Sequence, residues 1–346
     1  MQIYTIDPML DDRWNDLAAN HPRASVFHQR GWLEALARTY GYRPVALTTT
    51  PPGERLSDGI AFCEVRSWIT GKRLVSLPFS DHSEPLLNES ADAFELEEWM
   101  RKESHRRNWK YIEIRPLSGQ VHSEPDFVAT ESFWLHTLDL SAPLNQIFCH
   151  LHKDCLQRRI RRAEREHFSY ERGSSEKLVN DFYRLQMITR RRHMLLPQPL
   201  SWFRNLMASM SPNAEIRLVR KHGIPIAAIL TLRHHGTVVY KYGCSNAEFH
   251  HLAGMPFLFW KLIEESKATG AEQIDFGRSG LEDKGLITFK DRFGATRKRI
   301  SYLRYPKMAS QRELQPPKMP VLRRLFSVLP DAFSSMAGQL VYRHMG

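Results

Sequence analysis

The sequence predicts an α+β fold arranged in two domains, and three observations lead to this prediction. The chain has 346 residues, which is enough for two domains of ordinary size. Hydrophobic residues make up 42% of the sequence and charged residues 25%, as in folded globular proteins. After about residue 145, helical segments precede three antiparallel strands, a helix and a further strand. That order is typical of an α+β domain.

The first half contains helices and short strands in alternation. Apolar residues at helical spacing predict helices over residues 13–36, with a second helix starting near Trp32, and over residues 94–108. Gly41 and Pro44 end the first helical region. Short apolar runs between turn residues predict strands at 45–47, 59–65, 73–77 and 111–114.

The second half begins with helices predicted at 146–167, 177–193 and 202–210. Three strands follow, at 215–221, 224–233 and 237–242. The dipeptides His222-Gly223 and His235-Gly236 between them suit tight hairpin turns, because glycine tolerates positive φ. A helix at 255–268 and a strand at 273–276 complete the pattern.

The charge balance predicts an anionic partner. The net charge is +11 and the isoelectric point about 9.6. Nucleic acid, a phosphorylated small molecule and a membrane surface all remain open as that partner.

The four cysteines show no C-x-x-C spacing, so we expect buried free thiols in a reducing cytoplasm. The N-terminus lacks a signal-peptide pattern, and no apolar run approaches the ~18 residues of a membrane span, which predicts a cytoplasmic protein.

Four polar residues near the C-terminus form the most informative cluster. Within sixteen positions lie Asp275, Arg278, Ser279 and Lys290. Between and around them are the apolar residues Ile274, Phe276, Leu286, Phe289 and Phe293. The pattern predicts a buried strand, a loop, a short helix and a closing strand. A packed scaffold that presents a few charged groups at strand ends suits a site for an anionic substrate.

The same stretch carries a family resemblance. Asp-Phe-Gly-Arg-Ser at 275–279, Phe289-Lys290 and the pair Phe293-Gly294 resemble the C-terminal signature of FemAB-like proteins of the GNAT acyltransferase superfamily. The versions associated with exopolysaccharide and PEP-CTERM systems are the most similar. This chain has Phe-Gly where the family often has Trp-Gly, and its loop at 280–284 contains fewer glycines.

The resemblance implies a domain organisation and an activity. It implies an N-terminal GNAT-like lobe at 1–140, an acyltransferase lobe at 141–306, and a linker with an amphipathic tail at 307–346. The implied activity is direct transfer of an acyl or aminoacyl group to an amine of a cell-envelope (peptidoglycan) or exopolysaccharide precursor. Acyl-CoA or aminoacyl-tRNA would be the donor, with no bound cofactor. The paired histidines lack a third ligand at suitable spacing, so we also expect no metal.

Several residues receive roles from the resemblance, each with a structural alternative. Lys290 would contact an acceptor phosphate or stabilise transition-state charge, or would be a surface lysine. Asp275 would accept a proton from the amine, or would pair with Arg278. The loop holding Asp81 and His82 would lie near the acceptor, with His82 as a reserve general base, or would be a simple turn.

The segment from Lys153 to Arg192 is strongly basic, with twelve Lys or Arg against six acidic residues. Arginine forks suit phosphate, so Arg158, Arg161 and Arg191 are candidates for binding a polyanion or diphosphate. The alternative is a solvated helical face. A second functional hypothesis follows from this segment, namely a non-catalytic module that binds RNA or an anionic membrane.

The strand end at 240–245 is a candidate for donor contact. Alternation places Tyr240 and Tyr242 on one sheet face and Lys241 on the other. In GNAT lobes the donor enters beside this strand, so the resemblance makes Tyr242 and Lys241 candidate donor contacts. The alternative is core packing of the tyrosines. The next loop, 246–256, has one glycine and a proline, so it lacks the pyrophosphate motif of acyl-CoA enzymes.

The tail begins after residue 306 with a proline-rich linker. Residues 321–345 then offer an apolar helical face flanked by arginines. Its apolar members are Leu325, Val328, Leu329, Phe333, Met336, Leu340 and Val341, and the arginines are Arg323, Arg324 and Arg343. This pattern suits a helix on an anionic membrane or a helix docked on the protein's own core.

Overall fold

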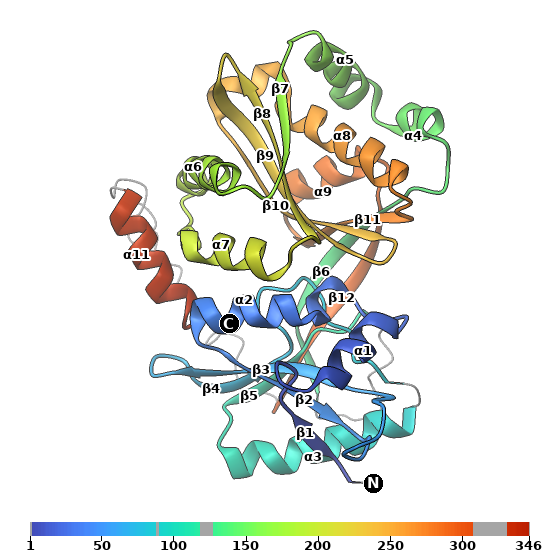
Figure 1. The fold of residues 1–346 in the computed structure, drawn as a ribbon, viewed down its shortest axis with the longest axis vertical. Helices are drawn as coiled ribbons and strands as arrows, with labels where there is room; N and C mark the ends of the chain where they lie inside the picture. The colour runs from blue at the N-terminus through green and yellow to red at the C-terminus, as the bar shows by residue number, and fades with distance from the viewer. Residues whose placement is uncertain (1, 88–89, 118–126, 307–330, 346) are drawn as a thin grey trace. The chain divides into compact units, whose positions relative to one another are not determined.

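In a computed structural model, the chain divides into two units, each with sheet strands flanked by helices (Figure 1). The structure describes residues 2–87, 90–117, 127–306 and 331–345. Unit 1 comprises Met1–Ser132, Ile300–Lys318 and Gln339–Gly346, and unit 2 comprises Phe133–Arg299 and Met319–Gly338. The predicted α+β fold class is confirmed.

Unit 1 contains strands in the order β1-β2-β3-β4-β5-β12. Their bounds are β1 Tyr4–Ile6, β2 Arg43–Thr48, β3 Ile60–Ser67, β4 Gly71–Val75, β5 Tyr111–Ile114 and the end of β12, Thr296–Tyr305. The pairing of β4 with β5 is parallel, and the pairings β1–β2, β2–β3, β3–β4 and β5–β12 are antiparallel. The four strands predicted in this half are therefore confirmed, whereas β1 was missed.

Helices flank the strands of unit 1 (Figure 1). Helix α3, Ser90–Arg107, packs Leu96 and Met100 into an apolar core with Phe62 and Ile112. The predicted helix at 13–36 is wrong in its extent, because it is two helices, α1 at Asp12–Asn20 and α2 at Arg30–Tyr40, separated by a 3-10 turn. His21 ends α1 in an extended conformation, as expected for the residue before Pro22.

Unit 2 contains strands in the order β6-β11-β10-β9-β8-β7. Their bounds are β6 Val128–Asp139 (from Phe133 in this unit), β7 Ser169–Gly173, β8 Ala214–Lys221, β9 Ile224–His234, β10 Thr237–Ser245 and β11 Gln273–Gly280. Only the β10–β11 pairing among these is parallel. The β8–β9–β10 meander was predicted, but β6 and β7 were not.

The helices of unit 2 cover both faces of its strands (Figure 1). On one face, α6 (Glu176–Arg192) and α7 (Leu200–Ser209) pack against β8, β9 and β10. On the other, α8 (Gly254–Ala268) packs against β8 and β9, with α5 (Arg158–Glu164) outside it. The short helix α9, Lys284–Asp291, follows β11.

The predicted long helix at 146–167 is also wrong in its extent. It consists of α4 (Leu144–His150), a π-helical turn (Lys153–Gln157) and α5. The buried Leu151 is extended and interrupts the helix. Gln157 compensates for the break, because its Nε2 donates to the carbonyls of Cys149 (3.1 Å) and Leu151 (2.8 Å).

Of the four free cysteines, Cys63 and Cys244 are buried as expected, whereas Cys149 is exposed and Cys155 half-buried.

Strand β10 contains a bulge that changes the direction of its tyrosines. The β9–β10 register shifts between Tyr240 and Tyr242. Tyr240 packs against Phe259 of α8, with ring centroids 4.7 Å apart, and Tyr242 packs against Phe203 of α7 at 5.3 Å. The two tyrosines therefore face opposite sides of the strand, and the alternation predicted from the sequence is wrong because the bulge inserts an extra residue.

The C-terminal helix α11, Asp331–Tyr342, follows the tail residues up to 330, which lie outside the described part of the chain. Its final residues belong to unit 1. There the Tyr42 hydroxyl donates to the carbonyl of Tyr342 (2.7 Å), whose ring packs against Phe79 (5.8 Å). Among the described residues, every helix is too short or too polar to cross a membrane.

Candidate functional site

A cavity of about 750 Å³ lies within unit 2. It is bordered by the start of β9, the end of β10 and the N-terminal end of α8. The end of α6, the first residues of α5 and the helix α9 complete its wall. The cavity thus collects residues from these six elements of unit 2.

The position of the cavity follows from the way β10 and β11 separate. These parallel strands pair only at Thr237–Val239 with Gln273–Asp275. Further along, β10 remains paired with β9, and β11 remains paired with β6. Ser245, the last residue of β10, lines the cavity. In sheets of this kind, ligands bind beyond the carboxyl ends of strands that diverge.

The N-terminal end of α8 supplies a favourable place for an anion. Gly254 and Met255 line the cavity, and Ala253 precedes them in a left-handed conformation (φ 62°) without a side-chain cap. The positive end of the helix dipole and the free amides of the first turn attract negative charge. A Cβ at Gly254 would lie 3.3 Å from side-chain atoms of Val219, Ile226 and Ala227, so glycine allows the helix to approach the strands closely.

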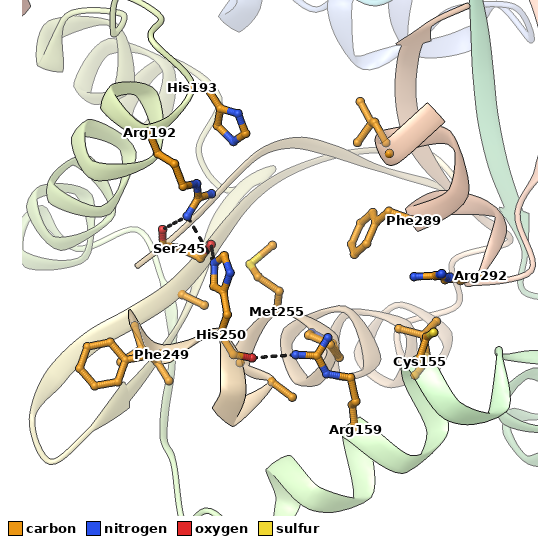
Figure 2. A pocket seen from close by; sticks show the side chains of 18 of the residues that line it. Cys155, Arg159, Arg192, His193, Ser245, Phe249, His250, Met255, Phe289 and Arg292 are labelled. Carbon is orange, nitrogen blue, oxygen red and sulfur yellow. Dashed lines mark hydrogen bonds between the residues drawn. The ribbon is translucent and has the colours of Figure 1, made fainter. Parts of the chain in front are cut away.

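Three exposed arginines line the same cavity: Arg159, Arg192 and Arg292. Arg159 donates to the carbonyl of His250 (2.7 Å), and Arg192 donates to the carbonyl of Ser245 (3.1 Å) (Figure 2). Within the described ranges, none of the three forms an ion pair with a carboxylate. Their charge is therefore available to a ligand.

His250 connects these groups at the rim of the cavity. Its Nε2 lies 2.9 Å from the Ser245 hydroxyl and 3.3 Å from Nη1 of Arg192 (Figure 2). Burial, followed by the charges of Arg192 and Arg159, lowers the pKa of His250 below its ordinary value. Burial and neighbouring arginines lower the pKa of His193 in the same way. Both imidazoles are therefore neutral at pH 7 and can accept or donate a hydrogen bond.

The remaining wall is mainly apolar. Leu156, Ile226, Phe249, Met255, Leu286 and Phe289 supply this surface. The acidic residue in the lining is Asp283, whose carboxylate caps α9 by accepting from the Leu286 amide (3.1 Å). A cavity with an apolar wall and a cationic rim suits a ligand that combines phosphate groups with an apolar or acyl portion.

The predicted cluster at 275–290 is assembled beside this cavity but does not line it. Lys290 is 2% exposed, and its Nζ donates to the carbonyls of Gly277 (2.8 Å) and Arg278 (3.0 Å). Asp275 accepts from the Gly277 amide (2.6 Å). The register shift of β11 lies between Asp275 and Arg278, and Gly277 has φ 71°. The structure thus brings Lys290, Asp275 and Arg278 together around a β-bulge.

The other members of this cluster have local neighbours. The guanidinium of Arg278 lies 4.1 Å from the ring centroid of Phe133. Ser279 is buried, and within the described residues its hydroxyl has no hydrogen-bond partner. The Tyr242 hydroxyl accepts from Gln198 (3.1 Å) and Trp202 (2.9 Å), and Lys241 Nζ lies 5.8 Å from the Tyr242 ring centroid. None of these four residues lines the cavity.

The three basic candidates of the arginine-rich segment lie outside the cavity lining as well. Arg158 pairs with Asp154 (2.9 Å), and Arg161 lies over the Phe148 ring at 5.3 Å. Arg191 is exposed at the end of α6. The residues that line the cavity are their immediate neighbours Arg159 and Arg192. Two arginines of the predicted segment therefore line the cavity, and packing decided which arginines of each helix face it.

Asp81 and His82 lie in unit 1. Arg115 donates to the carbonyls of Leu77 (3.1 Å) and Ser80 (3.2 Å), and the Tyr302 hydroxyl donates to the carbonyl of Asp81 (2.9 Å). His82 is buried, with its ring edge-on to Phe27 at 5.4 Å. The loop is therefore held by bonds to its backbone, and the catalytic roles of both residues remain predictions.

Sequence reasoning missed the cavity residues His250, Arg292 and Ser245. One signal was present, because residues 246–256 were interpreted as the loop that holds the donor pyrophosphate in acyl-CoA enzymes of the family. Their single glycine, Gly254, stands at the first position of α8. Among the described residues, no group of three or more His, Cys, Asp or Glu side chains is arranged to hold a metal ion.

Comparisons with known proteins bear on the fold of the chain. Residues 152–285 match the acetyltransferase (GNAT) domain family. The chain has a GNAT-like fold. The match covers β7 to β11 and most of the residues that line the cavity. A search of the curated proteins found no match.

Solved structures extend the likeness over most of the GNAT-like chain. FemX is 13% identical with a TM-score of 0.68, covering 87% of this chain and 97% of FemX. The C-terminal domain of a putative lysylphosphatidylglycerol synthetase from Agrobacterium fabrum is also 13% identical, with a TM-score of 0.57 and coverage of 87% and 92%. A tandem GNAT protein from the clavulanic acid biosynthesis pathway is 10% identical, with a TM-score of 0.54 and coverage of 89% and 100%. These identities establish similarity of fold.

Proposed function

We propose that the protein is an N-acyltransferase that moves an activated acyl or aminoacyl group onto an amine. One observation carries the proposal. The cavity of the GNAT-like domain lies where β10 and β11 diverge, beside the N-terminal end of α8, and three arginines without carboxylate partners among the described residues line it. A donor with phosphate groups matches this charge distribution.

Each part of the cavity has a task in this proposal. Arg159, Arg192 and Arg292 hold the phosphates of the donor, together with the amides at the start of α8. The apolar wall around Phe249 and Phe289 receives the less polar part of the donor. His250 keeps Arg192 in place through its ring nitrogen, 3.3 Å away, and through Ser245.

The reaction is a direct transfer. The acceptor amine attacks the donor carbonyl, an N–C bond forms, and the thioester or ester bond to the donor breaks. The amine gives up a proton, for which Asp275 is the candidate acceptor in unit 2; Asp81 and His82 of unit 1 keep the acceptor role that the family resemblance implies. The family resemblance gives Lys290 and Arg278 the task of stabilising the negative charge that develops on the carbonyl oxygen, although neither residue lines the cavity. Because Lys290 is bonded to the carbonyls of Gly277 and Arg278, its contribution would act through the shape of the β11 bulge.

The loop before α8 supports one donor class over the other. Acyl-CoA and aminoacyl-tRNA both carry phosphates that the arginines can bind. Pro256 removes one amide from the first turn of α8, and the loop has a single glycine. Arginine side chains would therefore replace backbone amides as the groups that donate hydrogen bonds to the phosphates. This favours aminoacyl-tRNA over acyl-CoA. The resemblance to FemAB-like proteins supports an acceptor among cell-envelope or exopolysaccharide precursors.

Mass spectrometry of transfer products tests the proposal. The full-length protein is incubated with charged tRNAs or with acyl-CoAs, together with amine-bearing envelope precursors. We expect a donor-dependent mass gain on the acceptor. Each charge-assisted hydrogen bond contributes ~1.5–3 kcal/mol, so Arg159→Ala or Arg192→Ala should weaken donor binding by roughly 10- to 100-fold.

Arg158→Ala is the matched control, because Arg158 is next to Arg159 but pairs with Asp154 outside the cavity. It should transfer at the wild-type rate. Absence of transfer with both donor pools, combined with tight RNA or vesicle binding that depends on the same arginines, would replace the enzyme with the non-catalytic binding module.

A further inference from the structure

The hairpin between β3 and β4 carries the most exposed aromatic side chain among the described residues. Trp68 is 87% exposed and Ile69 is 60% exposed, both at the tip of this hairpin in unit 1. The tip is well ordered by local bonds, because the Ser67 hydroxyl accepts from the amides of Ile69 (3.1 Å) and Thr70 (2.9 Å). Two large apolar side chains are therefore held in solvent on a rigid turn.

The C-terminal end of unit 1 is fastened to the same hairpin. The carbonyl of His344 accepts from Thr70 (3.1 Å) and Arg73 (2.8 Å), and its Nδ1 lies 3.0 Å from the Ser67 hydroxyl. The His344 ring meets Trp68 edge-on at 5.7 Å. These hydrogen bonds attach the C-terminal segment to the hairpin.

Three apolar side chains of this segment are exposed. Leu340 is 61% exposed, Val341 37% and Met345 49%. Leu340 and Val341 lie in the last turn of α11, and Met345 lies in the turn that follows it. Together with Trp68 and Ile69 they form one set, which we call the hairpin–tail surface.

Cations surround the hairpin–tail surface. Arg66 has a side chain that is 68% exposed, and it shares the carboxylate of Glu64 with Lys72. Arg343 is exposed within the tail. Lys110 is exposed beside the turn, since a Cβ at Gly71 would lie 3.4 Å from its Cδ. Four cations against one carboxylate leave a positive rim around an apolar tip.

We propose that the hairpin–tail surface binds an anionic lipid bilayer. Trp68 and Ile69 would enter the region between headgroup and acyl chain, where an indole ring is favoured because it combines an apolar body with a polar N–H. The flanking Lys and Arg side chains would contact lipid phosphates, with their aliphatic parts along the apolar boundary. A bilayer is favoured over RNA because the exposed residues at the tip of the hairpin, Trp68 and Ile69, are large and apolar.

Vesicle co-sedimentation of the full chain tests this proposal. The probes are vesicles of phosphatidylcholine alone and vesicles containing phosphatidylglycerol. We expect binding to the anionic vesicles that falls as salt is raised, since each cation near such a surface contributes roughly a fivefold increase in binding. The double variant Trp68→Ser/Ile69→Ser should bind at least about tenfold more weakly, because it removes two large apolar side chains.

Matched controls are Leu10→Ser and Ile224→Ser. Leu10 is 79% exposed in a turn of unit 1, and Ile224 is 51% exposed at the start of β9 in unit 2. Both should bind vesicles as the wild type does. Equal binding by the Trp68/Ile69 variant and the wild type would overturn the proposal. Concentration-dependent dimerisation that the variant abolishes, without vesicle binding, would overturn it in favour of a second copy of the chain.

Discussion

Two groups of arginines in this protein have the same side chain and opposite surroundings. In unit 1, Arg115 and Arg304 are buried and share the carboxylate of Glu113, at 2.8 Å and 2.6 Å. In unit 2, Arg159 and Arg192 are exposed at the cavity, and among the described residues they bond to carbonyls and to His250. A buried guanidinium without a counter-charge would be costly, so the first group is paired. The second group retains its charge for a ligand.

The protonation of Glu113 reflects the same difference. Burial opposes its ionisation, but the guanidinium groups of Arg115 and Arg304 outweigh burial and hold the pKa of Glu113 below its ordinary value. The cavity arginines affect a neighbour in the opposite sense, because they help to keep His250 neutral. Arginines that are paired with a carboxylate thus stabilise the fold, whereas arginines without a carboxylate partner among the described residues can bind a donor.

The largest effect is expected for Glu113→Gln. This change leaves two buried guanidinium groups without a carboxylate, so the free energy of unfolding should fall by about 3–5 kcal/mol. Chemical denaturation measures the loss. Asp154→Asn is the control, since it breaks an exposed ion pair with Arg158, and its effect should be much smaller. Similar losses in the two variants would contradict the distinction between the groups.

The next largest effect is expected for Lys290→Met, which tests whether a buried cation of unit 2 also stabilises the fold. The variant leaves the buried carbonyl of Gly277 and the carbonyl of Arg278 without this donor, which should lower the free energy of unfolding by about 2–3 kcal/mol. Lys284→Met, at the exposed start of the same helix, is the matched control and should leave stability unchanged. An unchanged unfolding midpoint for Lys290→Met would show that the bulge does not need the ammonium group.

The cavity arginines should matter little to folding. The double variant Arg159→Ala/Arg192→Ala should change the free energy of unfolding by about 0.5 kcal/mol or less, because exposed side chains away from buried features contribute little. Differential scanning calorimetry of this variant and the wild type measures the difference. A loss comparable to that of Glu113→Gln would assign these arginines a structural role and weaken the donor-binding proposal.

The smallest effect concerns pH. His136 is fully buried, and burial, followed by the charge of Lys290, lowers its pKa below the ordinary value. The unfolded chain therefore takes up a proton more readily than the folded one as pH falls below about 6.5. Stability should decrease in that range, before the carboxylates titrate.

Denaturation curves between pH 7 and pH 5 measure this dependence. The variant His136→Asn should show a shallower decrease of unfolding free energy with falling pH than the wild type. His21, His193, His250 and His344 shift in the same direction, so part of the slope should remain. An identical slope in the variant would exclude His136 as a contributor.

The sequence predicted the meander, α6, α7, α8 and the placement of Lys290 on a short helix, because each depends on local periodicity and turn residues. It missed the interruption at Leu151 and the bulge at Lys241. At both places the backbone conformation depends on side chains that pack against distant segments: Leu151 in the core, and Tyr240 and Tyr242 against α8 and α7. The local sequence pattern does not predict such contacts. β7 was missed for a related reason, since its half-exposed residues lack strict alternation.

The amino-acid sequence by itself determined the class of fold, the basic character of the segment from Lys153 to Arg192 and the family resemblance at 275–294. Composition, periodicity and motif spacing are local properties and need no knowledge of distant contacts. Only the tertiary structure decided which arginines of that segment reach the cavity and that Lys290 is buried against the β11 bulge. Neighbouring residues on a helix point in directions about 100° apart, so packing alone selects Arg159 over Arg158.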